Sequence, residues 1–320
     1  MRARNFSMTC IAASALAACQ AVIPDAPAPS ATVATPRAAG AAAGTASVPV
    51  AATQPSPRGL RTGTSFLEQS DFAVIRAELT QGGWLRGIVP ANTKRATLNG
   101  DTLVVDSEGR FFAAFDRDAG GIAILSALLE DGTTREERYT IEPRAWNIER
   151  VNVAKTPGGM SESFWKNVRE AEWNRIQAAR ATSSDSRGWA QDFVWPVRGR
   201  ISGRFGSQRI YRGEPGSYHT GLDIAPGAGT SFVAPADGVV TLAAAEPFSL
   251  EGHLIIIDHG QGLNSAFLHA ASIDVREGQR VTQGQRLGTV GASGRATGPH
   301  LHWSIMWRDA RLDPLLFVDR

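Results

Sequence analysis

Short apolar runs separated by turn-forming dipeptides constrain what this chain can fold into. Asn99-Gly100 stands between two such runs, which is the pattern of a β-hairpin closed by a two-residue turn. Glu108-Gly109 and Asp131-Gly132 divide further runs at similar spacing. Strands this short and this evenly punctuated predict that residues 63–155 form a small immunoglobulin-like β-sandwich.

Residues 189–320 repeat this pattern, so the sequence predicts a mainly β fold with a second, C-terminal all-β domain. Residues 254–257 are apolar at consecutive positions, which predicts a strand covered on both faces. A hairpin tip is expected at 308–311. The expected strands of this domain are 232–233, 238–243, 254–258, 264–268, 286–290 and 301–307.

Residues 156–188 are expected to connect the two domains as a helix followed by a linker. The helix should run from 161 to about 180, because Ser161 can cap it and Glu162 lies in its first turn. Its apolar stripe is only partial. We therefore expect it to pack on a domain rather than to stand alone.

The N-terminus resembles a bacterial lipoprotein signal. A short positive region is followed by an apolar run too short to span a bilayer, and Leu-Ala-Ala precedes Cys19. This pattern predicts a signal over residues 1–19 and lipidation of Cys19; an ordinary secretory signal is the alternative, and both imply export. Residues 20–62 are rich in Ala and Pro and predict a disordered tether. By analogy with sorting rules, Gln20 favours the outer membrane, so we expect a periplasm-facing lipoprotein of the cell envelope.

The charge and the cysteine content indicate which partners and which cross-links or metal sites to expect. The net charge is +2 with no basic block, which predicts no nucleic-acid partner. The two cysteines are Cys10, inside the signal, and Cys19, so neither a disulfide nor a cysteine-ligated metal site is expected.

All six histidines lie between His219 and His302, a clustering typical of a metal or acid–base site. His300 and His302 are two residues apart in an expected strand, so both rings should project from one face. His219 and Asp223 are four apart, which is again an even spacing in extended chain. Two imidazoles and one carboxylate are the ligands of an open catalytic zinc site.

At these residues the chain resembles the lysostaphin/LytM-type zinc metallopeptidases, which cleave peptidoglycan peptides. The resemblance rests on three motifs in order: His-x-x-x-Asp, a histidine after a strand, and His-x-His. It implies that His219, Asp223 and His302 bind one zinc ion per chain. It also implies that His269 and His300 are the unbound catalytic histidines.

The resemblance covers about 194–317, with departures. Phe267 stands where the family often has Tyr, and His253 where it often has Asn. We expect His253 and His259 to be structural histidines, satisfied by backbone or water. Arg209 and Arg212, in the loop before the first motif, are placed to meet substrate carboxylates.

The leading functional hypothesis is an envelope-tethered zinc endopeptidase that hydrolyses peptide cross-links between peptidoglycan stem peptides. Other cell-wall enzymes are possible partners. The first alternative is a non-hydrolytic LytM-like activator of cell-wall amidases, but such proteins have lost the ligands that this chain retains. The second is a lipoprotein adhesin with structural zinc, which would normally close its fourth coordination position with another Cys or His.

Overall fold

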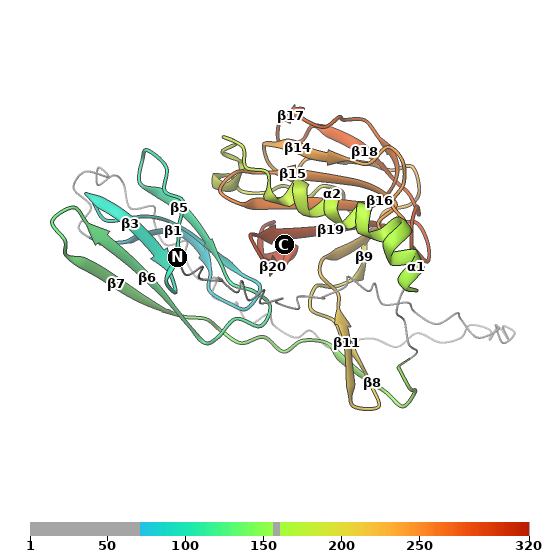
Figure 1. Ribbon diagram of the computed structural model, residues 1–320, viewed down its shortest axis with the longest axis horizontal. Coiled ribbons are helices and arrows are strands. Elements are labelled where there is room, and N and C mark those ends of the chain that lie inside the picture. Colours follow the sequence, from blue (N-terminus) through green and yellow to red (C-terminus); the bar gives the residue numbers. More distant parts are fainter. Residues whose placement is uncertain (1–70, 156–160, 320) are drawn as a thin grey trace, which may run out of the picture.

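The computed structural model describes residues 71–155 and 161–319 (Figure 1). The predicted signal over 1–19, the lipidation at Cys19 and the tether over 20–62 all fall outside these ranges. Within the described ranges, no helix combines the length and the apolar character that crossing a bilayer requires.

The N-terminal part is a sandwich of two antiparallel sheets with strand orders β1-β2-β5 and β4-β3-β6-β7. This Greek-key arrangement is that of an immunoglobulin-like sandwich, as predicted. The Asn99-Gly100 turn joins β3 to β4. Its two central residues have φ values of 51° and 94°, and a type I′ turn requires positive φ at both positions. The strands are β1 (Ala73–Glu78), β2 (Trp84–Ile88), β3 (Thr93–Leu98), β4 (Asp101–Thr102), β5 (Arg110–Ala114), β6 (Ile122–Leu129) and β7 (Thr134–Thr140).

The C-terminal part is built on one sheet with the order β17-β14-β15-β16-β19-β12-β9, to which β13, β18 and β20 attach. The mainly β fold is therefore confirmed. The predicted tip lies between β19 and β20. The strands are β9 (Arg200–Gly203), β12 (Leu222–Ala225), β13 (Ser231–Val233), β14 (Gly238–Ala243), β15 (His253–Asp258), β16 (Leu263–Ile273), β17 (Arg280–Val281), β18 (Arg286–Val290), β19 (Leu301–Trp307) and β20 (Ala310–Leu312).

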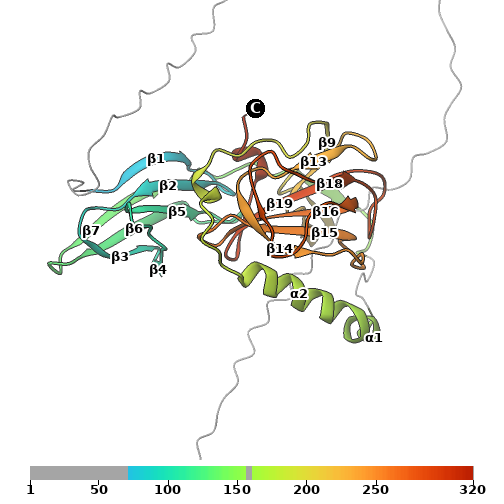
Figure 2. The ribbon, with the colours of Figure 1, turned by 90° about the horizontal axis from the view of Figure 1, so that it is seen from above.

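One continuous helix joins the two parts, in segments α1 (Glu162–Phe164), η2 (Trp165–Arg169) and α2 (Glu170–Ala181), followed after the linker by a short turn, η3 (Gly188–Ala190). Ser161 caps it by accepting a hydrogen bond from the Phe164 amide. Figure 2 shows α2 lying along β14 and β15. Ile176 packs there in a cluster with Leu254 and Ile256, while Ile255 and Ile257 face the main core, so β15 is covered on both faces as predicted.

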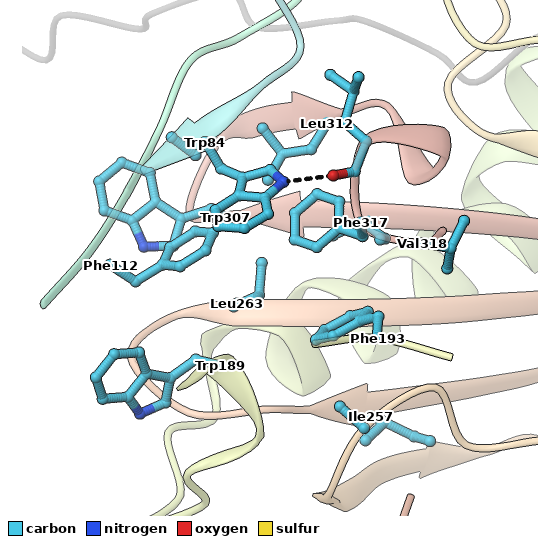
Figure 3. Packing of buried hydrophobic residues seen from close by; sticks show 14 of the residues in the cluster. Trp84, Phe112, Trp189, Phe193, Ile257, Leu263, Trp307, Leu312, Phe317 and Val318 are labelled. Atoms are coloured by element: carbon cyan, nitrogen blue, oxygen red, sulfur yellow. Dashed lines mark hydrogen bonds between the residues drawn. The ribbon is translucent and has the colours of Figure 1, made fainter. Parts of the chain in front are cut away.

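The sandwich and the C-terminal part share one hydrophobic core. Trp84 and Phe112 of the sandwich pack against Phe317 of the C-terminal part, with ring centroids 5.2 and 6.4 Å away (Figure 3). The Trp84 indole also donates a hydrogen bond to the carbonyl of Leu316, the last residue of the turn η4 (Pro314–Leu316). The sandwich is therefore fixed against the domain that carries the histidines.

The sandwich and the C-terminal part are also connected through a separate small sheet with the strand order β11-β10-β8. The hairpin of β10 (Gln208–Tyr211) and β11 (Glu214–Tyr218) pairs in parallel with β8 (Ile148–Val151), which follows the sandwich in the chain. The loop before the first histidine motif is thus an ordered hairpin. It projects from the main sheet beside β9 (Figure 1).

Candidate metal centre

Three predicted ligands converge because β12 and β19 pair antiparallel with Asp223 directly opposite His302. His219 lies just before β12. Asp223 Oδ1 is 2.8 Å from His302 Nδ1 and 3.1 Å from His219 Nε2, and the two imidazole nitrogens are also 3.1 Å apart. These three residues form a possible metal-binding group. The β12–β19 pairing therefore brings the three side chains together, with His219 reaching the group from the loop that precedes β12.

The donor set fits zinc. Ligand atoms about 2.0–2.1 Å from a tetrahedral zinc are separated by about 3.3 Å, close to the observed triangle. Burial alone would raise the pKa of Asp223, but the hydrogen-bonding and charge interactions with His219 and His302 outweigh it and hold that pKa far below its usual range. The carboxylate is therefore ionised at neutral pH. His219 Nδ1 lies 3.1 Å from the Arg204 carbonyl, which can only accept, so its Nε2 is left as the metal-facing atom.

Two glycines make room for these ligands. A Cβ at Gly203 would lie 2.3 Å from Asp223 Oδ2, and one at Gly221 would lie 2.7 Å from His302 Nε2. Neither contact is possible in a real side chain. No sequence pattern predicted the requirement for Gly203, because it arises from the β9–β12 pairing, which places Gly203 opposite Asp223.

His269 is aimed into the same site by an irregular strand. The β15–β16 register shifts here, which places an extra residue in β16, and His269 has φ 66°, a conformation rare outside glycine. Its Nδ1 lies 2.8 Å from the Ser293 carbonyl and must donate to it, which leaves Nε2 without a proton. Burial, opposed by this hydrogen bond, lowers the pKa of His269 to about 4.

His300 is presented in the same way. Its Nδ1 donates to the Gly298 carbonyl at 2.8 Å, and its Nε2 lies 3.8 Å from Asp223 Oδ1. The His269 and His300 rings have centroids 4.9 Å apart. The Nε2 atoms of both rings thus stand beside the three converging ligand atoms, and in the neutral tautomer that donates from Nδ1 each Nε2 can accept a proton.

The remaining two histidines are structural, as predicted. His253 Nδ1 donates to the Ala244 carbonyl. His259 is fully buried, donating from Nδ1 to the Asp237 carbonyl at 2.8 Å and accepting at Nε2 from the Ser265 hydroxyl at 2.9 Å. Phe267, at the family's frequent Tyr position, packs in the core 5.6 Å from the Phe232 ring.

The centre lies in a cleft of ≈ 560 Å³. Arg209 lines it as expected, but its Nε is paired with Glu149 Oε2 at 2.6 Å. Arg212 is exposed at the tip of the β10–β11 hairpin and is not among the lining residues, so the expectation that it borders the cleft was wrong. Residues that sequence analysis missed line the cleft through long-range pairing: Asn147, Glu149, Arg204 and Arg295.

The C-terminal part is similar in sequence to known proteins. Residues 217–314 match the family model for peptidase family M23. Peptidoglycan DD-endopeptidase ShyA of Vibrio cholerae serotype O1 is 38% identical over 113 residues, 34% of this chain and 25% of ShyA. Murein hydrolase activator NlpD of Escherichia coli K12 is 34% identical over 124 residues, 39% of this chain and 30% of NlpD.

A crystal structure from Pseudomonas aeruginosa, described as a peptidase M23, aligns with a TM-score of 0.56 at 30% identity. The alignment covers 75% of this chain and 95% of that one. The fold and the histidine–aspartate cluster define a domain of the metallopeptidase class. The chain belongs to peptidase family M23, which confirms the resemblance seen in the motifs. It spans less than a third of the length of ShyA and of NlpD.

Proposed function

We propose that this protein is a zinc-dependent endopeptidase that hydrolyses peptide cross-links of peptidoglycan in the bacterial envelope. The observation that carries the proposal is the complete and convergent site. His219, Asp223 and His302 would hold one zinc ion, and the Nε2 atoms of His269 and His300 face the same cleft.

Zinc in such a site polarises the scissile carbonyl and lowers the pKa of water. The protein's own groups supply the proton transfers. One unprotonated Nε2 accepts the proton of the attacking water and returns it to the departing amine. The second imidazole would stabilise the charge that develops on the carbonyl oxygen when its Nε2 carries a proton taken from solvent, which it keeps throughout the reaction. The Ser293 and Gly298 carbonyls keep both rings in the tautomer that this chemistry needs.

The substrate proposal rests on charge and on similarity. Cross-link amides between D-alanine and the side-chain amine of a diamino acid are flanked by free carboxylates. The exposed guanidinium groups of Arg204 and Arg295 line the cleft and suit such anions. ShyA, similar over the C-terminal part, is named a peptidoglycan DD-endopeptidase, which supports the same bond class here.

The test is digestion of purified sacculi by the full-length protein, with zinc content measured in parallel. We expect one zinc per chain and conversion of cross-linked dimers into monomers without release of glycan chains. His219→Ala, Asp223→Ala or His302→Ala should each remove most of the zinc. His269→Ala and His300→Ala should keep zinc and lower the cleavage rate by about 100-fold or more.

An amidase activator is the second candidate, because NlpD is similar over much the same region. The complete ligand set favours the enzyme. A zinc-loaded protein that cleaves no cross-link but stimulates a separate amidase would establish the activator instead. Release of whole stem peptides from glycan would indicate amidase action by the chain itself.

We also propose that a lipid on Cys19 anchors the protein in the outer membrane of the cell envelope. Export places the site where peptidoglycan lies, and the lipoprotein-like signal supports an anchor. We expect Cys19→Ala to release the protein from the membrane fraction. A variant that remains equally membrane-bound would exclude the anchor without affecting the peptidase proposal.

A further inference from the structure

A buried ion pair links the connecting helix to the loop beside the site. Arg169, in η2, donates from both terminal nitrogens to Glu251, each at 2.7 Å, and the two side chains are 3% and 9% exposed. Glu172, one turn further on, lies 3.1 Å from Arg169 and accepts hydrogen bonds from the Ser249 amide and hydroxyl at 2.7 and 2.6 Å. One turn of helix therefore binds the segment Ser249–Gly252, which we call the clamp segment, through an ion pair and hydrogen bonds.

Stability alone is a weak reason for this arrangement. Removing two charges from water costs about as much as their attraction returns, so a buried ion pair often adds little net stability. The helix also widens into a π turn at Trp165–Arg169, the turn that delivers the guanidinium. Such turns are uncommon and concentrate at functional sites. Both features suggest that the contact fixes a geometry.

The other side of the clamp segment contacts His269. The Glu251 carbonyl accepts the His269 amide at 2.9 Å. Gly252 lies so close to Ser293 that a Cβ there would be 2.3 Å from its hydroxyl, and the Ser293 carbonyl accepts His269 Nδ1–H. Both hydrogen bonds that orient His269 thus end on the clamp segment or on the residue packed against it.

His269 needs such support because its backbone is strained. A non-glycine residue in the left-handed region is strained and persists only where its surroundings over-determine it. The β15–β16 pairing does not supply this constraint, since its register breaks at this position. The other pairings of β16 flank His269 without including it: the pairing with β19 ends at Leu268, and the pairing with β18 begins at Ala270.

We propose that Arg169 and Glu172 are positioning residues for His269, acting through the clamp segment. This inference rests on the proposed function, in which His269 Nε2 acts on substrate. It adds that the connecting helix, outside the residues matched to the family model, is part of the machinery that sets the site.

The experiment compares Arg169→Met with Arg175→Met in the full-length protein. Arg175 is a matched control because it joins the same helix to the same domain through Glu277 at 3.1 Å, but both partners are about half exposed. Nitrogen-15 NMR of the histidine rings reports whether His269 keeps its proton on Nδ1. Zinc content, kcat and KM on cross-linked muropeptides are measured alongside.

For Arg169→Met we expect retained zinc, loss of the Nδ1–H signature, an unchanged KM and a kcat lower by about 10- to 100-fold. Arg175→Met should resemble wild type in all four. Arg169→Lys keeps the charge without the two-pronged contact and should recover only part of kcat. A native His269 signature with full kcat in Arg169→Met would overturn the proposal.

The double variant Arg169→Met/Glu251→Gln separates positioning from stability, because it removes both charges of the Arg169–Glu251 pair, while Glu172 keeps its hydrogen bonds from Ser249. It also provides the test if Arg169→Met alone does not fold. We expect thermal stability to return while kcat and the His269 signature stay impaired; recovery of all three would reduce the pair to a structural role. If wild type cleaves nothing, the NMR signature still decides the positioning claim while the proposed function fails separately.

Discussion

Two glycines determine how closely the backbone approaches the candidate ligands. Gly203 faces Asp223 from the neighbouring strand, and no side chain fits between them. We expect Gly203→Ala to displace the carboxylate and to weaken zinc binding by about 10- to 100-fold, the usual effect of disturbing a ligand's support.

The measurement is zinc affinity by competition with a chromophoric chelator. Gly298→Ala is the matched control, because this glycine also lies beside the site but nothing stands within 4 Å of its added Cβ. Equal zinc affinity in Gly203→Ala and wild type would mean that Asp223 is not held where the structure places it or does not bind the metal.

His259 should make stability depend on pH. Burial, opposed by its hydrogen bond to Asp237, lowers its pKa to about 4, while an unfolded histidine titrates near 6.5. Between these values the unfolded chain binds the extra proton, so the stabilisation is fully present above pH 6.5 and is lost as pH falls through 4. The loss amounts to about 3 kcal/mol.

Urea unfolding between pH 7 and pH 4 measures this effect, with His259→Gln as the comparison. The variant is less stable at pH 7, but its free energy of unfolding should fall less steeply, by about 1.4 kcal/mol per pH unit for the missing proton. Parallel slopes in the two proteins would assign the pH dependence to other groups.

At the scale of elements, α2 is held mainly by the face it buries against β14 and β15. Ile176 is 3% exposed and packs with Leu254 and Ile256. We expect Ile176→Ala to cost about 2–4 kcal/mol, the range for truncating a buried aliphatic side chain. Val168, 39% exposed on the same helix, is the control, and Val168→Ala should cost no more than about 0.5 kcal/mol. Similar unfolding midpoints in urea for the two variants would contradict the packing.

At the scale of the whole molecule, the shared core predicts that both parts unfold together. Phe112 belongs to the sandwich, yet its ring packs against Trp307 and Phe317 of the C-terminal part at 6.2 and 6.4 Å. Phe112→Ala should cost about 3–5 kcal/mol. Ile122→Ala, at a position 60% exposed on the same sandwich, should change little.

Calorimetry tests the coupling. We expect one transition in wild type and in both variants, with the lower melting temperature in Phe112→Ala. Two separated transitions in wild type would show that the sandwich and the C-terminal domain are independent units, despite the apolar contact between them.

The sequence alone determined the features that depend on neighbouring residues. Turn dipeptides such as Asn99-Gly100 and apolar runs such as 254–257 act within a few residues, so the strands and the doubly covered β15 could be predicted. The cap at Ser161 is equally local. The spacings could also be interpreted, because alternate residues of a strand share a face, which predicted that His219 lies with Asp223 and His300 with His302. The ligand set of His219, Asp223 and His302 came from the resemblance of the motifs to a known family.

Only the tertiary structure decided the rest, because it depends on which distant segments pair. The parallel pairing of β8 with β10 brings Glu149 to the cleft and to Arg209, 60 positions away. The ion pair of Arg169 with Glu251 spans 82 positions. Such pairings are selected by the summed packing of the whole chain and not by local preference, so no pattern in the sequence predicts them.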